Sequence, residues 1–199
     1  MSSAFEARTL ACVAGAFLAG SVPFGVLLTR HLVGVDVRHQ GSGNIGATNV
    51  ARVAGRKLGL WVLFLDALKG AVPTFLVWEL CPADERLHVL VAYAAILGHV
   101  FTPWLRLKGG KGVATALGTL LVLEPWAALG AGAVYGLVFW RMRVSSIGSL
   151  AGALTAVTIA FLVPGRRLYA FFVLGVMLLL LWTHRSNLRR LWRRRERKL

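Results

Sequence analysis

The sequence predicts an all-α membrane protein with seven transmembrane helices, an outer N-terminus and a cytoplasmic C-terminus. Three observations support this fold class: the apolar content, the length of the apolar runs and the distribution of positive charge between them. Of 199 residues, 57% are hydrophobic and 16% are charged, whereas a soluble domain carries about a quarter charged residues. One bilayer crossing takes roughly 20 apolar residues, so little chain remains for a soluble domain. Any chemistry must therefore sit in short loops or at helix ends.

Seven apolar runs bounded by charge, Pro or Gly are the candidate helices. In chain order they are Leu10–Leu28, Leu58–Leu80, Leu87–Leu105, Val113–Leu123, Trp126–Trp140, Ile147–Val163 and Leu168–Trp182. The fourth and fifth runs are short and only Glu124-Pro125 separates them, so they can be two crossings or one broken helix. The charge distribution favours two crossings.

With seven spans and an outer N-terminus, nearly all basic residues lie on the inner side, as the positive-inside tendency requires. Lys69 lies within a span, and the basic residues on the outer side are Arg8, Arg86, Arg166 and Arg167. Merging the fourth and fifth runs would move the basic C-terminal tail outside. The net charge of +15 is thus explained by membrane orientation. Because the basic residues follow no single amphipathic face, a nucleic-acid partner is not expected.

Residues 1–184 are predicted to form one seven-helix domain, and residues 185–199 a basic cytoplasmic tail that contacts lipid headgroups. Removing Arg193–Leu199 is therefore expected to affect membrane association more than turnover. The first run is expected to be a retained span rather than a signal peptide, because Glu6 precedes it and a Gly- and Asn-rich stretch follows. Cys12 and Cys81 both fall toward the outer side; a disulfide is possible, but no framework spacing supports it.

Four polar segments fall on the inner side of this topology. They are the Gly-rich loop Gly41–Arg52, the turn Lys108–Gly112, the pair Ser145-Ser146 and the stretch His184–Arg190. Glycines let backbone N–H groups approach a ligand, and each segment supplies cationic or hydroxyl donors. The turn also runs into a helix whose N-terminus favours an anion. Together these features predict a site for a phosphate ester.

Each segment also has a plainer interpretation. The Lys108–Gly112 turn is not a nucleoside-triphosphate loop, because Leu105 and Gly112 stand where that motif requires Gly and Ser or Thr; alone it is equally well an ordinary tight turn. Ser145-Ser146 alone is typical of a helix N-cap. The Gly-rich loop is harder to dismiss, since Asn44, Asn49 and Arg52 accompany its glycines.

Ionisable residues inside the predicted spans leave two alternatives open. Asp66 and Lys69 lie one helical turn apart and either form an ion pair that locks helices together or place Lys69 at the ligand. His99 is interpreted as a packing residue, and no metal site or cofactor is expected, because no other ligand stands at suitable spacing. His31 and Asp36 form the H-x-x-x-x-D pattern of one class of glycerolipid acyltransferases. That class uses a soluble domain, so we interpret this match as accidental.

The chain resembles the bacterial integral-membrane glycerol-3-phosphate acyltransferases that use acyl phosphate as donor. The matching stretches span most of the chain: GSVPFG at 20–25, GSGNIGATNVAR at 41–52, DALKG at 66–70, GHVF and LKGGKGVAT within 98–115, SSIGS at 145–149 and HRSNLRRL at 184–191. One departure is Thr102, where the family usually has Pro. The resemblance implies seven transmembrane helices and a cytoplasmic active site in a bacterial inner membrane.

The resemblance also implies the reaction: transfer of a fatty acyl group from acyl phosphate to the 1-hydroxyl of sn-glycerol 3-phosphate, with no cofactor. Membrane lipids and an upstream enzyme that makes acyl phosphate are the implied partners. Matched to the family's motifs, the catalytic residues are Ser42, Arg52, Lys111, Ser145, Ser146, His184 and Asn187, and the substrate- or phosphate-binding residues are Asn44, Asn49, Lys69, Lys108, Gly109, Gly110, Gly112 and Arg190. The amides of Gly109, Gly110 and Gly112 are expected to form a phosphate cradle. Either His184 or a substrate phosphate oxygen is the base, and substrate assistance is preferred.

Two other classes compete with the enzyme. A transporter or flippase for a phosphorylated lipid would also need a cationic vestibule, although no inverted repeat or matched pair of broken helices is evident. A basic-tailed scaffold that gathers anionic lipid would explain residues 185–199 but not the glycine-rich loops.

Overall fold

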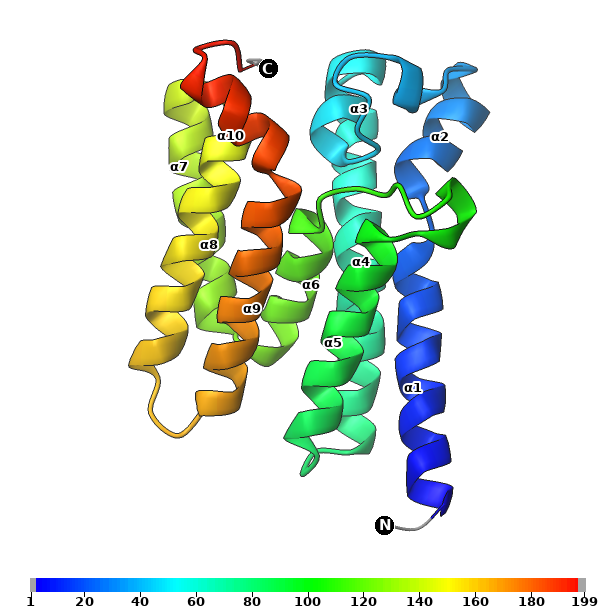
Figure 1. The fold of residues 1–199 in the computed structure, drawn as a ribbon, viewed down its shortest axis with the longest axis vertical. Coiled ribbons are helices and arrows are strands. Elements are labelled where there is room, and N and C mark those ends of the chain that lie inside the picture. Colours follow the sequence, from blue (N-terminus) through cyan, green and yellow to red (C-terminus); the bar gives the residue numbers. More distant parts are fainter. Residues whose placement is uncertain (1–2, 197–199) are drawn as a thin grey trace. The chain divides into compact units, whose positions relative to one another are not determined.

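The computed structural model describes residues 3–196, with side chains from residue 6 onward, and divides into two compact units. The first unit extends to Thr119 and the second begins at Leu120. All regular secondary structure within the described residues is helical (Figure 1). The last three residues of the predicted basic tail, 197–199, lie outside the described range.

The helix bounds follow the predicted apolar runs, with breaks inside two of them. The first unit contains α1 (Ser3–Ser21), α2 (Phe24–Val33), η1 (Val37–His39), α3 (Ala47–Ala54), α4 (Arg56–Leu80), α5 (Glu85–Val100), η2 (Pro103–Leu105) and the start of α6 (Val113–Leu123). The second contains the end of α6, α7 (Pro125–Met142), α8 (Ser145–Leu162), α9 (Arg167–Thr183) and α10 (Arg185–Trp192).

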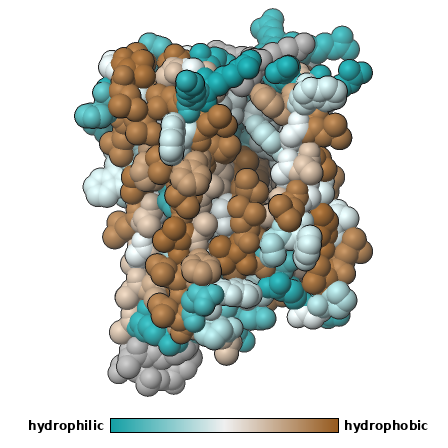
Figure 2. All heavy atoms as spheres, turned by 180° about the vertical axis from the view of Figure 1, so that it is seen from behind, coloured by the Kyte–Doolittle hydropathy of each residue, from teal (hydrophilic) through white to brown (hydrophobic). Residues whose placement is uncertain are grey.

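By length and apolar composition, four helical segments of the described chain can cross a membrane, or five if the bent pair α9 and α10 counts as one span. The four are Glu6–Val33, α4, Glu85–Leu105 and α8. Figure 2 shows brown hydrophobic side chains over the middle of the visible helices and teal hydrophilic ones toward the helix ends. The all-helical membrane class is thereby supported, while seven crossings and the orientation of the termini stay predictions.

The predicted run Leu10–Leu28 is one apolar segment but two helices, because the chain breaks at Val22-Pro23. Pro23 has no N–H to donate, and the main-chain carbonyls of Ser21 and Val22 instead accept side-chain donors. Thr102 Oγ1 donates to the Ser21 carbonyl at 2.6 Å, and Lys69 Nζ donates to the Val22 carbonyl at 2.7 Å. Thr102, the departure from the family pattern, therefore supplies a hydrogen-bond donor to the carbonyl at the end of α1.

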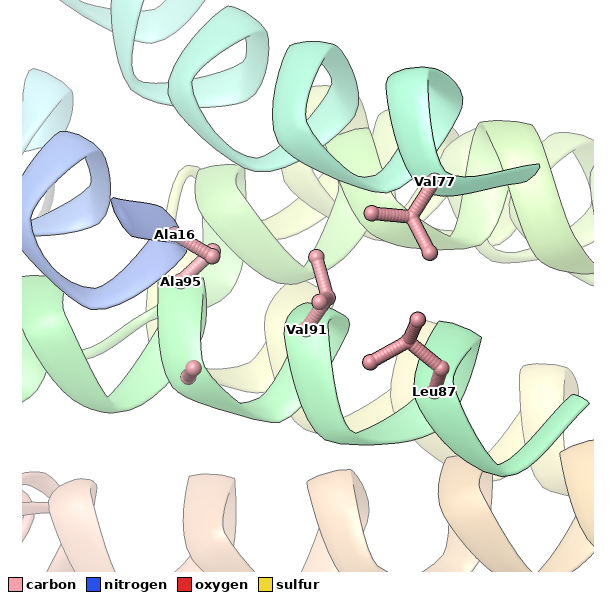
Figure 3. Packing of buried hydrophobic residues seen from close by; sticks show 6 residues of the cluster. Ala16, Val77, Leu87, Val91 and Ala95 are labelled. Atoms are coloured by element: carbon pink, nitrogen blue, oxygen red, sulfur yellow. The ribbon is translucent and has the colours of Figure 1, made fainter. Parts of the chain in front are cut away.

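The core of the first unit lies where α1, α4 and α5 meet. Ala16 of α1, Val77 of α4 and the residues Leu87, Val91 and Ala95 of α5 point toward one another there (Figure 3). Small residues allow a close approach of α1 and α5: a Cβ on Gly20 would lie 2.0 Å from the Ala95 carbonyl oxygen. Cys12 and Cys81 pack against this cluster as free thiols, so the possible disulfide is not formed.

The helix α6 ends at Leu123 and α7 begins at Pro125, so the chain breaks at Glu124. Glu124 is 2% exposed, and its Oε1 lies 3.2 Å from Arg166 Nε. Arg166 also donates to the Leu123 carbonyl at 2.8 Å and stacks over the Tyr169 ring. A basic residue that the topology places outside thus forms an ion pair with a buried carboxylate and donates a hydrogen bond to a helix end.

Candidate functional site

The Gly-rich loop of the first unit connects η1 to α3 and is organised around Asn49. Asn49 is 2% exposed, and its Nδ2 lies 3.2, 3.0 and 2.9 Å from the carbonyl oxygens of Val37, Gln40 and Asn44. Its Oδ1 accepts the Ser42 N–H at 2.8 Å. These bonds occupy the amide, so Asn49 holds the loop together.

Other amides of the loop also have partners within it. The Gly43 N–H donates to the Gln40 carbonyl at 3.0 Å, and the Gly46 N–H donates to Asn44 Oδ1 at 2.9 Å. The predicted ligand Asn44 is therefore also a loop-forming residue. Ser42 is exposed and Arg52 is partly exposed, so the loop presents a hydroxyl and a guanidinium near its surface.

The Asp36 carboxylate braces the chain just before this loop. It accepts hydrogen bonds from Arg38 Nη2 at 2.7 Å and Arg30 Nη2 at 2.6 Å and caps η1 through the Arg38 N–H. The side-chain hydrogen bond from Arg38 holds the pKa of Asp36 below its ordinary value. His31 is exposed, and these contacts give Asp36 a structural role, as expected for an accidental H-x-x-x-x-D match.

The Lys108–Gly112 turn does not form the predicted cradle of three amides. The Gly109 N–H donates to the Val100 carbonyl at 3.0 Å, and the Gly110 N–H donates to the His99 carbonyl at 3.1 Å. Both of these amides fix the turn against the end of α5. Glycine is needed at 110 for another reason: a Cβ there would lie 2.0 Å from His99 Nε2.

Both lysines of the turn, Lys108 and Lys111, are at least partly exposed to solvent. Lys108 is exposed, Lys111 is partly exposed, and Gly112 is buried with a φ of 89°, a region that favours glycine. Leu105, just before the turn, packs against the same hydrophobic cluster as Ile45 and Val50 of the Gly-rich loop. The loop and the turn therefore share one support at the same end of the first unit.

Lys69 forms the ion pair that was one of the two alternatives. Its Nζ lies 2.7 Å from Asp66 Oδ1 and donates to the Val22 carbonyl, and the residue is 6% exposed. Asp66 Oδ1 also lies 3.7 Å from His99 Nδ1, and His99 is 3% exposed. These contacts link α4, the α1–α2 break and the end of α5, so His99 is a packing residue, as predicted.

We expect Lys69→Met to lower thermal stability sharply and activity only slightly. Removing one partner of a buried ion pair leaves an uncompensated charge, which costs about 3–5 kcal/mol. The double change Asp66→Asn with Lys69→Met should recover part of the loss. Melting temperature and turnover measured on both variants check this. A variant with wild-type melting temperature and abolished turnover would instead place Lys69 at the ligand.

The second unit brings together the remaining predicted site residues at the start of α8 and the end of α9. Ser145 Oγ lies 3.1 Å from Tyr135 Oη of α7, and Ser146 is 3% exposed. Both serines begin α8, yet neither side chain caps it. The plainer N-cap interpretation is therefore wrong. Ser146 Oγ instead donates to the Glu196 carboxylate at 3.1 Å.

His184 lies at the junction of α9 and α10, where the chain bends by 59°. Its Nδ1 is 2.8 Å from the Leu180 carbonyl oxygen, and the residue is 1% exposed. A carbonyl can only accept, so Nδ1 carries the proton and Nε2 of the neutral ring is an acceptor. The bend also sets Asn187, which is 5% exposed, one turn along α10.

Glu196 is the functional candidate that the sequence interpretation missed. Its carboxylate accepts hydrogen bonds from Ser146, Asn187 and Arg190, with Arg190 Nε at 2.7 Å. Burial alone would raise the pKa of Glu196, but the hydrogen bonds from Arg190 and Asn187 outweigh it, so the pKa is lowered. The available signal was its isolation, since Glu196 is the single acidic residue in 185–199.

These contacts also change the interpretation of the C-terminal tail. The tail up to Glu196 returns to the predicted site residues of the second unit rather than serving lipid contact alone. Removing Arg193–Leu199 would release all three partners of Glu196. The expectation that this truncation spares turnover is therefore withdrawn.

The fold and these two clusters define a class: a helical protein with membrane-length apolar helices that carries cationic and hydroxyl side chains at helix ends. The glycerol-3-phosphate acyltransferase family model matches residues 10–194. The chain belongs to this family and is an acyltransferase.

Individual relatives agree with the family match over nearly the full chain. The glycerol-3-phosphate acyltransferase of Myxococcus xanthus is 58% identical, covering 96% of this chain and 99% of the relative, and that of an Anaeromyxobacter species is 49% identical, covering 96% of each. Crystal structures of PlsY, an integral membrane glycerol 3-phosphate acyltransferase, are also similar. Its glycerol 3-phosphate form is 36% identical with a TM-score of 0.92 and 96% coverage of each chain. Its lysophosphatidic acid form has a TM-score of 0.90 at 35% identity, covering 96% of this chain and 95% of that one.

Proposed function

We propose that this protein transfers a fatty acyl group from acyl phosphate to the 1-hydroxyl of sn-glycerol 3-phosphate, forming 1-acyl-sn-glycerol 3-phosphate and phosphate. The observation that carries the proposal is the full-length similarity to PlsY in its glycerol 3-phosphate form. The lysophosphatidic acid form of the same relative supports the product. The donor rests on the resemblance of the loop and turn motifs to acyl-phosphate-dependent enzymes.

The residues proposed for the site suit this chemistry. Arg52, Lys111, Arg190 and the Ser42 hydroxyl would neutralise and hold phosphate oxygens, through charge-assisted hydrogen bonds. The 1-hydroxyl oxygen attacks the acyl carbonyl carbon, the bond from that carbon to the phosphate oxygen breaks, and phosphate leaves. Acyl phosphate is already activated, so no covalent enzyme intermediate is needed, and positioning with charge neutralisation supplies the catalysis.

The hydroxyl proton is proposed to pass to a phosphate oxygen of the substrate, with His184 as an auxiliary group. The carbonyl of Leu180 fixes the His184 ring so that Nε2 is an acceptor, which suits either orienting the hydroxyl or accepting its proton. We expect His184→Ala to lower kcat less than about 10³-fold. A loss above that value at unchanged KM, measured by steady-state kinetics, would make the histidine the base.

An in vitro donor assay tests the function as a whole. Purified protein in detergent, where transport is impossible, is given glycerol 3-phosphate with acyl phosphate, acyl-coenzyme A or acyl carrier protein thioester. Lysophosphatidate and inorganic phosphate should appear in equal amounts, and only when acyl phosphate is the donor. Use of a thioester donor would overturn the donor assignment. Absence of product with every donor, from protein that still binds glycerol 3-phosphate, would favour the transporter alternative.

The topology proposed for this reaction is seven crossings in a bacterial inner membrane, with the N-terminus outside and both clusters on the cytoplasmic side. It rests on the positive-inside distribution. Cysteine labelling can test it in a variant whose Cys12 and Cys81 are replaced. Exposed positions serve as probes: Gln40→Cys and Lys108→Cys should react from the cytoplasmic side and Arg86→Cys from the outer side. Labelling of positions 40 and 108 from opposite sides would exclude a shared site.

A further inference from the structure

The amide of Asn49 lies at the centre of the Gly-rich loop and contacts every part of it. Three carbonyls share its Nδ2 hydrogens: Val37 of η1, Gln40 just after it and Asn44 within the loop. Its Oδ1 accepts the Ser42 N–H at 2.8 Å and faces Arg52 Nη1 at 3.4 Å. One buried side chain therefore contacts both loop residues assigned to phosphate.

The space and the hydrogen-bond partners around position 49 fit an asparagine side chain, and neither aspartate nor glutamine fits both. Gly41 has a φ of 59°, and a Cβ on it would lie 2.3 Å from Asn49 Oδ1. An aspartate at position 49 would present oxygen instead of N–H to three carbonyls. A glutamine would carry one methylene too many for a residue that is 2% exposed.

We propose that Asn49 is a positioning residue for the phosphate site: its Oδ1 sets the Ser42 main chain and the Arg52 guanidinium, and it does not touch substrate itself. This inference rests on the proposed function, which assigns Ser42 and Arg52 to phosphate. The physical reason is that both lone pairs of Oδ1 and both hydrogens of Nδ2 are used inside the loop. A neutral acceptor orients the guanidinium without cancelling its charge.

The position of Asn49 on α3 explains how it reaches both groups. Arg52 follows Asn49 by three residues, which places the two side chains on neighbouring positions of one helix face. Ser42 lies seven residues before Asn49, across the loop. The bonds to Ser42 and Arg52 therefore tie the loop to the first turns of α3, and the loop and helix are expected to move as one unit.

A double-mutant cycle between Asn49 and Arg52 tests the inference. Asn49→Ala alone is expected to raise KM for glycerol 3-phosphate about tenfold or more, with a smaller change in kcat. In an Arg52→Lys background the same change should cost less than about threefold, because lysine lacks the planar fork that Asn49 orients. Gln40→Ala, which removes an exposed amide side chain, is the matched control and should change neither constant.

Three results would overturn the inference. An equal loss from Asn49→Ala in both backgrounds would mean that Asn49 supports the fold alone. Full activity of Arg52→Lys and also of Arg52→Ala would remove the group that Asn49 is said to position, and with it the phosphate role of Arg52 in the proposed function. If Asn49→Ala changed only the melting temperature and neither kinetic constant, Asn49 would not position the phosphate site. The proposed function would then remain intact. Should Asn49→Ala not fold, Asn49→Ser, which keeps a small polar side chain, carries the same comparison.

Discussion

Replacing Arg52 or Lys111 with alanine is expected to lower kcat/KM by about 10²–10³-fold while leaving the fold intact. Each change removes a charged donor aimed at a substrate oxyanion, and the loss of one such donor costs on this scale. Neither residue is buried, since Arg52 and Lys111 are both partly exposed. Steady-state kinetics in detergent, with circular dichroism and melting temperature alongside, would measure the effect.

The matched controls are two neighbouring cations at the start of α4. Arg56 and Lys57 are exposed and are not assigned to the phosphate site. Their alanine variants should keep activity within about twofold, because exposed charges away from a site change little. Near-normal turnover in Arg52→Ala or Lys111→Ala, or equal losses in the Arg56 and Lys57 controls, would discredit the phosphate-binding assignment.

Replacing Glu196 with alanine is expected to abolish most activity and to loosen α10. The carboxylate holds Ser146 at the start of α8 and both Asn187 and Arg190 of α10. Breaking a partly buried network by removing its acceptor leaves its donors unpaired, which costs about 1–3 kcal/mol. Activity, melting temperature and proteolysis of the tail measured together would separate the two effects. Arg195→Gln, at an exposed neighbour, is the local control and should behave as wild type.

The Glu196 contact also predicts a pH dependence. Its pKa is lowered in the folded protein, so the carboxylate binds protons less readily folded than unfolded. Its stabilisation is therefore present at neutral pH and is lost as the pH falls below the ordinary carboxylate pKa of about 4.3. Melting temperature followed from pH 7 to pH 3 should fall more for the wild type than for Glu196→Ala. Parallel curves would show that ionisation of Glu196 contributes nothing to the pH dependence of stability.

Much of the fold was predictable because apolar length and charge are read directly from the sequence. All seven apolar runs are helical, and the Glu124-Pro125 junction separates two helices. The breaks within the first and third runs were not predicted. The first occurs at Pro23, where Thr102 and Lys69 donate to the Ser21 and Val22 carbonyls. The third occurs after Val100, where the N–H groups of Gly109 and Gly110 donate to the Val100 and His99 carbonyls.

For the candidate site, the sequence indicated which segments carry polar residues but not which of their atoms are available. A glycine can serve a ligand or a close packing contact, and Gly110 serves the second against His99. Asn49 looks like a phosphate ligand in a motif, yet its amide is used by the loop. Hydrogen-bond partners of backbone amides depend on tertiary contacts, so no spacing rule could assign them.

The sequence by itself determined the helical membrane class, the family and the residue types proposed for the phosphate site, because these follow from composition and from motifs that lie close together along the chain. Only the tertiary structure decided that Lys69 pairs with Asp66 and the α1–α2 break, and that Glu196 closes on Ser146, Asn187 and Arg190. Lys69 and Val22 are 47 residues apart, and Glu196 and Ser146 are 50 apart. Such pairs form because buried polar groups must find partners wherever the packed helices bring them, whatever their separation in sequence.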